Sequence, residues 1–480
     1  MKRGGFYPCA IFVFKIMKRC LNMTELAAKC MREEPRFRGL KKFHKNLCLS
    51  SPTMHGEELE FINQAFQTNQ IMSIGENIDR LEDIVSKYAG VRYAVALNSG
   101  TAAIHLAVKL AAEKIYGSSS GVSTPDGLGV GGSLFGKRAF CPAFAPAAAV
   151  NPIVYEGGEP VFIDASPDDW GMDPQALEAA FEKYPDVKLV VFAHLYGFPG
   201  QVDVIKKICE KHDALLIEDA AESLGAKRNE RPVGSFGDYG IFSFDENKII
   251  TGGFGGMLFT NDGCGAAKAR EWSAQSMGDA QWNQHEELGY NYRMNNVIAG
   301  IVLGQWGRLE EHIAKKERIY RLYSKRLGLL GMELNPYDVG KSKPNYWLSC
   351  MRIEPNSLCK EVRSDQAYIY ENVHGRTCPM EVLDALEAFH AQGRPVWKPM
   401  HLQPLYRNHE FVSIDGGRRA FGGGYSGMFE RADESKSLFD QGVCLPSDIK
   451  MTEEEQERVI EIIYACCSSR EFTEGKVFPA

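Results

Sequence analysis

Long apolar runs, metal-type cysteine pairs and a net positive charge are all missing from this chain of 480 residues. No apolar run approaches the roughly 20 residues of a membrane-spanning helix, and the run from Phe6 to Phe14 has about half that length. The thirteen cysteines contain no C-x-x-C pair, which argues against structural zinc. The net charge of −7 provides no overall basic field for nucleic acid, although a local basic groove stays open. We therefore expect no membrane span, no metal site and no nucleic-acid partner.

What is present is the composition of an ordinary folded protein, with 44% hydrophobic and 24% charged residues. A chain of this length suits several packed domains. Its odd number of cysteines is unlike a secreted disulfide scaffold and indicates free thiols in a reducing, cytoplasmic environment. The basic N-terminus lacks the cleavage site of a signal peptide, because Lys15, Lys18 and Arg19 follow its apolar run. We expect residues 1–50 to be a poorly ordered extension, or the true start to lie at a later methionine.

Apolar strand-like segments alternate with amphipathic helical segments along most of the chain. The strand-like segments of the first half are 93–97, 152–154, 160–163, 188–192, 214–217 and 239–244. Such alternation predicts a mostly parallel sheet covered by helices on both faces. We expect an α/β fold with a large domain over residues 51–310, a loop insertion at 115–138 and a smaller C-terminal α+β domain over 311–480.

A glycine-rich motif at 127–132 matches the dinucleotide-binding pattern G-x-G-x-x-G. That fingerprint requires a strand before it, a helix after it and an acidic residue about 20 positions further on. Serine, threonine and proline precede the motif here, and no strand pattern does. We interpret it as part of a flexible loop.

A phosphate site is suggested where the strand-like segment 93–97 leads through Asn98-Ser99-Gly100 into a helix. The N-terminus of a helix has unpaired N–H groups and the positive end of the helix dipole, so it can hold an anion. Gly100 would let the backbone approach a phosphate, and Thr101 would add a hydroxyl. A simple helix cap by Ser99 or Thr101 explains the same residues equally well.

Two further motifs place an acid and a lysine after apolar strands. Asp219 follows the segment 214–217, at the edge of the sheet where ligands bind in open α/β folds. It would either cap the next helix or hold a protonated ring nitrogen. Lys248 follows a strand that contains Ser243, and glycines come behind it. A loop lysine is most often a surface charge, but burial beside glycines would lower its pKa and make it nucleophilic.

Together these motifs match the requirements of one cofactor. A phosphate cradle, an aspartate for a ring nitrogen and a lysine for an aldehyde, in this order along an α/β chain, are what pyridoxal 5′-phosphate needs. The lysine would hold the aldehyde and later move a proton, while the aspartate would keep the pyridine ring protonated. The cradle would retain the cofactor while its covalent partner changes.

At this point the chain resembles the DegT-type nucleotide-sugar aminotransferases, which have the fold-type I architecture of the aspartate aminotransferase superfamily. The resemblance covers about 49–463 and rests on segments 98–103, 151–155, 160–164, 194–197, 217–222, 234–237, 242–248 and 289–294. Within the family the chain looks most like the branch that makes 4-amino-4,6-dideoxy-N-acetyl sugars for polysaccharides and glycans. Support for this branch comes from 51–54, 247–251, 395–401 and 442–446.

The resemblance implies a role for each matching residue. Lys248 would be the catalytic lysine bound to the cofactor, Asp219 would pair with the ring nitrogen, and Glu222 would lie near the ring's 3-oxygen. Gly100, Thr101 and Ser243 would hold the phosphate. An asparagine at the position of Asn291 would reach the phosphate of the neighbouring subunit, which implies a homodimer with shared active sites. Trp397 and His401 would lie near the sugar or the amino donor.

The implied reaction is transamination of a nucleotide-linked 4-keto-6-deoxy sugar, of UDP-N-acetyl type, with L-glutamate as the donor. Two departures leave details open. Pro146 stands where the family has an aromatic residue against the pyridine ring, and Phe144 could take its place. Gln70 stands where relatives often have tryptophan, which leaves the sugar and the nucleotide open. Two rival functions remain: sugar dehydration, which Lys248 argues against because the dehydratases have histidine there, and a catalytically silent PLP-binding or regulatory protein.

Overall fold

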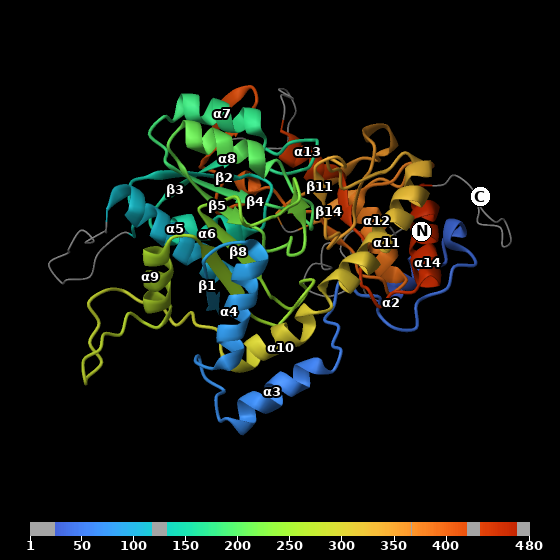
Figure 1. Ribbon diagram of the computed structural model, residues 1–480. Helices are drawn as coiled ribbons and strands as arrows, with labels where there is room; N and C mark the ends of the chain where they lie inside the picture. Colours follow the sequence, from blue (N-terminus) through green and yellow to red (C-terminus); the bar gives the residue numbers. More distant parts are fainter. Residues whose placement is uncertain (1–24, 118–131, 366, 420–432, 468–480) are drawn as a thin grey trace, which may run out of the picture.

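The computed structural model describes residues 25–117, 132–365, 367–419 and 433–467. Two packed bodies make up the molecule (Figure 1). One is built on a nine-stranded sheet, and the other carries the long helices α11 (Leu309–Leu327), α12 (Pro379–Ala388) and α14 (Glu453–Cys467). The glycine motif at 127–132 lies, except for its last residue, outside the described residues.

The large sheet is mostly parallel, as the sequence predicts. In spatial order its strands are β1 (Tyr93–Leu97), β9 (Gly256–Thr260), β8 (Tyr239–Ser243), β5 (Leu215–Asp219), β4 (Leu189–Ala193), β2 (Arg138–Pro142), β3 (Glu159–Ile163), β16 (Glu410–Ser413) and β17 (Gly416–Arg419). The strands from β8 to β16 run parallel to one another, whereas β9 is antiparallel to both β1 and β8, and β17 is antiparallel to β16. Every residue of β4 and β8 is buried, because helices cover both faces.

The two faces of the sheet have different helices. On one face lie α5 (Gly100–Tyr116), α6 (Asn151–Tyr155) and α9 (Gly263–Ser273), and on the other lie α4 (Glu76–Ala89), α7 (Pro174–Lys183) and α8 (Val202–Lys211). Helix α5 is buried over most of its length, which explains why its sequence is apolar on all sides. Helix α3 (Glu57–Gln67) packs on α10 (Asn296–Trp306), and a break at Gly307 separates α10 from α11.

The smaller body contains an antiparallel sheet. Its strands in order are β10 (Glu333–Leu334), β12 (Cys350–Arg352), β18 (Gly442–Cys444) and β15 (Arg394–Pro395), with α13 (Glu434–Gln441) leading into β18. Short strands form two further sheets: β6 (Lys227–Arg228), β7 (Arg231–Pro232) and β11 (Ser342–Lys343), and the pair β13 (Glu361–Arg363) and β14 (Tyr368–Tyr370). None of the helices in the described ranges is long and apolar enough to cross a bilayer.

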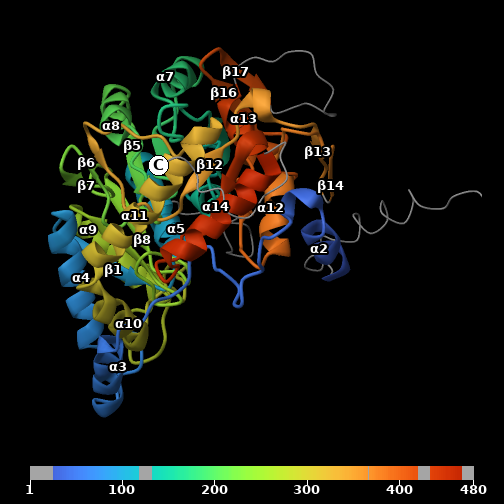
Figure 2. The same cartoon turned by 90° about the vertical axis from the view of Figure 1, so that its right-hand side faces the viewer.

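The N-terminal region corrects one expectation. Helix α2 (Glu25–Arg32) packs against α12 (Figure 2), and Phe37, Phe43 and Leu47 are buried in the same core. The expectation of a poorly ordered extension is therefore wrong for residues 25–50. Beyond the short helix α2, whose Ala28 and Met31 are buried, the apolar side chains of this region follow no helical period because they fill gaps on the smaller body.

Two local expectations also differ from the structure. Residues 152–154, expected as a strand, belong to helix α6, where Pro152 occupies the first turn and its missing N–H costs no hydrogen bond. Strands β16 and β17 lie within the range expected for the small domain, yet β16 pairs in parallel with β3 and extends the large sheet. The chain thus returns to the large body before it completes the small one.

Candidate active site

A cavity of about 430 Å³ lies where the carboxyl ends of β5 and β8 meet the N-terminus of α5. This is the edge at which α/β sheets bind ligands. Seven of the predicted site residues line it: Gly100, Thr101, Asp219, Glu222, Ser243, Lys248 and Trp397. The smaller body closes the cavity with Trp347, Arg394 and Trp397. Residues that are up to about three hundred positions apart in the sequence therefore line one pocket.

The first wall is the turn that starts α5. Ser99 caps the helix, since its Oγ accepts a hydrogen bond of 3.1 Å from the Ala102 N–H. The cap and the anion site are therefore compatible, because the cap uses Ser99 and leaves Thr101 on the cavity. A Cβ placed on Gly100 would lie 2.9 Å from the Ser243 Cβ and 3.1 Å from its Oγ. Glycine is thus required for the α5 N-terminus and Ser243 to lie together.

Asp219 ends β5 and points into the cavity. One carboxylate oxygen accepts a hydrogen bond of 2.9 Å from the Ala221 N–H. Burial raises the pKa of Asp219 to about 6, Glu222 acts in the same direction, and Lys248 acts against it. Within the described ranges, no cation lies at ion-pair distance from Asp219. A buried carboxylate of this kind is complementary to a cationic ligand group, such as a protonated pyridine nitrogen.

Lys248 and Glu222 face each other in the wall of the same cavity. The Lys248 Nζ lies 3.8 Å from the Glu222 Oε1, and the other Glu222 oxygen accepts a hydrogen bond of 2.7 Å from the Tyr196 N–H. Burial raises the pKa of Glu222, and the charge of Lys248 opposes that shift. The same Nζ lies 4.3 Å from the centre of the Trp347 ring. The amine is therefore held inside the pocket between a carboxylate and an aromatic face.

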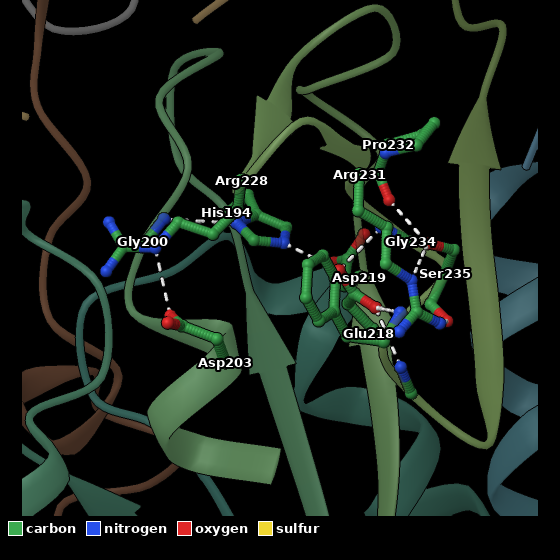
Figure 3. Close-up of polar contacts among 12 residues, drawn as sticks. His194, Gly200, Asp203, Glu218, Asp219, Arg228, Arg231, Pro232, Gly234 and Ser235 are labelled. Atoms are coloured by element: carbon green, nitrogen blue, oxygen red, sulfur yellow. Dashed lines mark hydrogen bonds and ion pairs between the residues drawn. The ribbon is translucent and has the colours of Figure 1, made fainter. Parts of the chain in front are cut away.

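Glu218, next to Asp219, lies on the other side of β5 and has a different environment (Figure 3). It accepts a hydrogen bond of 2.9 Å from the His194 Nε2 and further bonds from the N–H groups of Gly234, Phe236 and Gly237. The His194 Nδ1 accepts from the Gly200 N–H, which assigns the proton of the neutral ring to Nε2. This buried network fixes the end of β5 from which Asp219 projects.

The cofactor-facing position contains no aromatic ring from the predicted segment. Pro146 lines the cavity, whereas Phe144 is buried and packs against Trp170 and Tyr196 at ring-centre distances of 6.5 and 6.3 Å. Phe144 therefore does not replace the missing aromatic residue in this conformation. The aromatic side chains that do line the cavity are Phe254, Trp347 and Trp397.

Two predicted residues lie outside the cavity wall. Asn291 is exposed, and its backbone carbonyl accepts a hydrogen bond of 3.0 Å from the Asn98 side chain. His401 is buried, stacks on Phe411 and has its Nε2 at 3.1 Å from an Asp433 oxygen. Neither side chain reaches the cavity of its own chain, and the role of each stays a prediction.

Among the cavity residues that sequence reasoning missed, two come from the smaller body. Trp347 and Arg394 line the pocket, yet each follows Lys248 by about a hundred residues or more and belongs to no motif near it. Arg394 makes no ion pair within the described residues. The only available signal was indirect, because Arg394 directly precedes the segment 395–401 that the family resemblance had marked.

Pyridoxal phosphate fits this set of residues. The close contact of Gly100 with Ser243 shapes a cradle for a phosphate. Asp219 is buried without an ion-pair partner among the described residues and is complementary to a cationic group of a ligand. The Lys248 amine lies inside the cavity, where it could bind an aldehyde. The donors differ from a metal site, and no cluster of three or more potential metal ligands is found in the part of the chain that the structure describes.

Comparison with known proteins agrees with this geometry. The family model described as DegT/DnrJ/EryC1/StrS aminotransferase family matches residues 52–464. EpsN of Bacillus subtilis (strain 168) is 36% identical over 88% of this chain and 95% of its own length. A GDP-perosamine synthase of Caulobacter vibrioides is 32% identical over 75% of this chain and 86% of its own.

The fold has the same relatives. The crystal structure of DesI, solved in the presence of its TDP-sugar product, superposes with a TM-score of 0.71 and 22% identity, covering 92% of this chain and 97% of DesI. The predicted fold type, family and cofactor are thereby confirmed. The chain belongs to the DegT/DnrJ/EryC1/StrS aminotransferase family and is a pyridoxal phosphate-dependent sugar aminotransferase.

Proposed function

We propose that this enzyme transfers the amino group of glutamate to a nucleotide-linked 4-keto-6-deoxy sugar. The observation that carries the proposal is the convergence of Lys248, Asp219 and the Gly100–Ser243 cradle in one cavity. Pyridoxal phosphate, when bound, supplies the electron sink for the Cα electrons of each substrate. One site serves both substrates in turn, so the kinetics should be ping-pong.

Each residue then has a defined task. Lys248 would hold the cofactor aldehyde through Nζ, and its free amine would carry the proton to and from the substrate Cα. Asp219 would place its negative charge beside the ring nitrogen of the cofactor, and Glu222 would lie next to the 3-oxygen of the ring. Gly100, Thr101 and Ser243 hold the phosphate while the covalent bond to Lys248 is exchanged.

The sugar class is supported by the relative named for GDP-perosamine, a nucleotide-linked product. The motifs at 247–251 and 395–401 favour an N-acetylated UDP sugar within this class. A panel of UDP-, GDP- and dTDP-linked 4-ketosugars, assayed with glutamate, tests the proposal. Turnover of at least one member is expected. If all are inert while the protein holds its cofactor and still exchanges amino groups with glutamate, the ketosugar assignment is wrong.

Arg394 supports an acidic amino donor. It lines the cavity on the side of the smaller body, and its positive charge acts to lower the pKa of Glu222, against the effect of burial. A guanidinium group binds a carboxylate through paired hydrogen bonds. Losing a hydrogen bond to a charged group costs about 1.5–3 kcal/mol, so Arg394→Met should raise the KM for glutamate by about ten- to a hundred-fold.

In the same variant the reaction of the aminated cofactor with the ketosugar should keep its rate. Arg318→Met on the exposed face of α11 is the matched control and should leave both half-reactions unchanged. An unaltered KM for glutamate in Arg394→Met would remove Arg394 from the donor site.

The active enzyme is also proposed to be a homodimer. Asn291 is exposed and lies outside the cavity of its own chain, as expected for a residue that serves the neighbouring subunit. Met277, Trp282 and Leu288 are exposed on the segment that leads to it. Apolar side chains exposed together on one segment favour a covered surface.

A further inference from the structure

Helix α11 supports the loop of the catalytic lysine from the smaller body. The His312 Nδ1 lies 2.8 Å from the Ile249 carbonyl, one residue after Lys248. Lys316 follows His312 by four residues and therefore lies on the same face of α11, one turn further along. The two side chains approach the loop from the same direction.

Lys316 is buried and its amine has three hydrogen-bond acceptors. The Nζ donates to the Ser50 Oγ at 3.1 Å, to the Trp347 carbonyl at 2.9 Å and to the Ser447 carbonyl at 2.7 Å. Burial lowers the pKa of Lys316 to about 7, and nearby Asp448 acts in the opposite direction. Because a neutral amine has only two N–H bonds, three acceptors select the ammonium form.

Two of the residues that accept a hydrogen bond from Lys316, Ser50 and Trp347, also donate one to the same carbonyl oxygen, which lies immediately before Lys248. The Asn247 carbonyl accepts a hydrogen bond of 3.1 Å from the Ser50 Oγ and one of 2.7 Å from the Trp347 Nε1. The ring of Trp347 also supports the Lys248 Nζ at 4.3 Å from its centre. Lys316 thus holds both groups that fix the peptide unit immediately before Lys248.

We propose that Lys316 is a positioning residue for the catalytic lysine, acting through Ser50 and Trp347 on the Asn247 carbonyl. The proposal rests on the proposed role of Lys248. Without the ammonium group, Ser50 loses a donor and the carbonyl of Trp347 is left without its buried partner. The donors of Ser50 and Trp347 to the Asn247 carbonyl are then held less firmly, although the Lys248 N–H keeps its hydrogen bond to the Asp245 carbonyl. The Nζ is therefore less precisely directed toward Glu222.

Hydrogen exchange of the full-length protein tests this directly, with and without added cofactor. The amides of Lys248 and Gly252 are protected by hydrogen bonds to the carbonyls of Asp245 and Phe244. Lys316→Met should speed exchange in the segment 244–252 by about ten-fold or more, because a lost buried hydrogen bond costs at least about 1.4 kcal/mol. Lys315→Met is the matched control, since Lys315 pairs with Glu311 on the surface of the same helix.

A kinetic readout separates positioning from general stability. In Lys316→Met the kcat should fall by about ten-fold or more while the KM for glutamate changes little, because Nζ is misdirected and the donor site is intact. Combining Lys316→Met with Ser50→Ala should cost less than the two effects multiplied, because both act on the same carbonyl. Ser50→Thr, which keeps the hydroxyl, should restore the rate that Ser50→Ala loses.

Unchanged exchange in 244–252 together with unchanged kcat in Lys316→Met would overturn the proposal. If that variant does not fold, Trp347→Phe takes its place: it keeps an aromatic face, although a smaller one, and loses the Nε1 donor, and it must by itself speed exchange in 244–252. Failure of the role of Lys248 has a different signature. Borohydride labelling would then find the cofactor on another lysine, whereas exchange in 244–252 would still respond to Lys316.

Discussion

Glu218 and Asp219 are adjacent on β5 but have different environments, because successive residues of a strand face opposite sides of the sheet. Glu218 points to the side of His194 and accepts hydrogen bonds from the ring and from three backbone N–H groups. Asp219 points into the cavity and is left with one backbone donor. The acid with few partners is the one available to a ligand, and burial holds its pKa high until a cation arrives.

The charge of Asp219 can be removed with little change in shape. In Asp219→Asn the cofactor should still bind, because the cradle and Lys248 remain, but each half-reaction should slow by orders of magnitude as the ring nitrogen loses its counter-ion. Stopped-flow absorbance of each half-reaction measures this. Asp213→Asn, an exposed aspartate before the same strand, should retain normal rates. Near-normal turnover of Asp219→Asn would refute the ring-nitrogen role.

Asp169 is another buried carboxyl whose pKa is raised, and it gives the stability of the large body a dependence on pH. Burial raises its pKa to about 7, and the Gly171 N–H opposes this. The unfolded chain has an aspartate pKa of about 3.9, so between about pH 4 and 7 the folded chain binds the extra proton. The stability contributed by this group is therefore full below about pH 4 and is lost as the pH rises to about 7.

Asp169→Asn keeps the acceptor for Gly171 and cannot ionise. The free energy of unfolding of the variant, relative to the native chain, should increase by about 1–4 kcal/mol between pH 4 and 8. Denaturant unfolding at several pH values measures the difference. Asp168→Asn, the exposed neighbour, should leave the pH dependence of the native chain intact. A variant with the same pH dependence as the native chain would show that Asp169 ionises freely.

At the scale of elements, local sequence patterns are sufficient to predict a part of the site wherever a single strand and the turn after it form that part. The segment 93–104 was predicted as strand, turn and helix, and β1 and α5 have those positions. Lys248 and Asp219 are predicted in the same way, and both line the cavity. Trp347 and Arg394 could not be found, because they reach the cavity only when the smaller body packs on the larger, and no pattern near either residue reports that contact.

The misassigned elements have a related cause. Ile153 and Val154 are β-branched, which favours a strand, but Pro152 lies in the first turn of a short helix that packs Ile153 under α5. Residues 33–50 show no sustained period, and the whole segment 25–50 owes its order to packing on α12 and α14, far away in the sequence. Tertiary packing overrides local preference in both places.

The junction of α5 with β8 gives a prediction for the cradle. Gly100→Ala would place a methyl group 2.9 Å from the Ser243 Cβ, and Ser243 must move away from the phosphate position. We expect the affinity for pyridoxal phosphate to fall by about ten- to a hundred-fold, the cost of one or two hydrogen bonds to a charged group. Equilibrium titration of the cofactor-free protein measures it.

Gly307→Ala is the matched control for that substitution. Gly307 has helical dihedral angles, and an added Cβ there would meet no atom within 4 Å. The control should bind the cofactor normally. Equal affinity of Gly100→Ala and Gly307→Ala would show that the contact of Gly100 with Ser243 does not shape the phosphate site.

At the scale of the whole molecule, the cavity is a joint product of two bodies. The large sheet supplies the cradle, Asp219 and Lys248, and the smaller body supplies Trp347, Arg394 and Trp397. Asn291 is the one predicted cofactor residue that a single chain does not bring to the cavity. A two-fold homodimer, the commonest closed assembly, would supply it from the neighbour.

Mixing two differently impaired variants tests whether the site is shared. Asn291→Ala should weaken binding of the cofactor by about ten- to a hundred-fold, and Lys248→Ala should abolish turnover. In a mixed dimer with shared sites, one site collects both lesions and the other has neither. Activity well above that of either parent should therefore appear after subunit exchange, measured at a cofactor concentration low enough to leave the Asn291→Ala parent mostly empty.

The alternative is that Asn291 serves only its own turn, as its backbone contact with Asn98 allows. Each chain of the mixed dimer would then carry its own lesion, and no intact site could form. Exchange itself must be verified, by mass-tagging one variant and finding the mixed species. With exchange verified and the cofactor limiting, recovered activity requires that Asn291 act across the interface, since only that arrangement gathers both lesions in one site and leaves the other site intact. Absence of recovery would confine Asn291 to its own chain and refute the shared site.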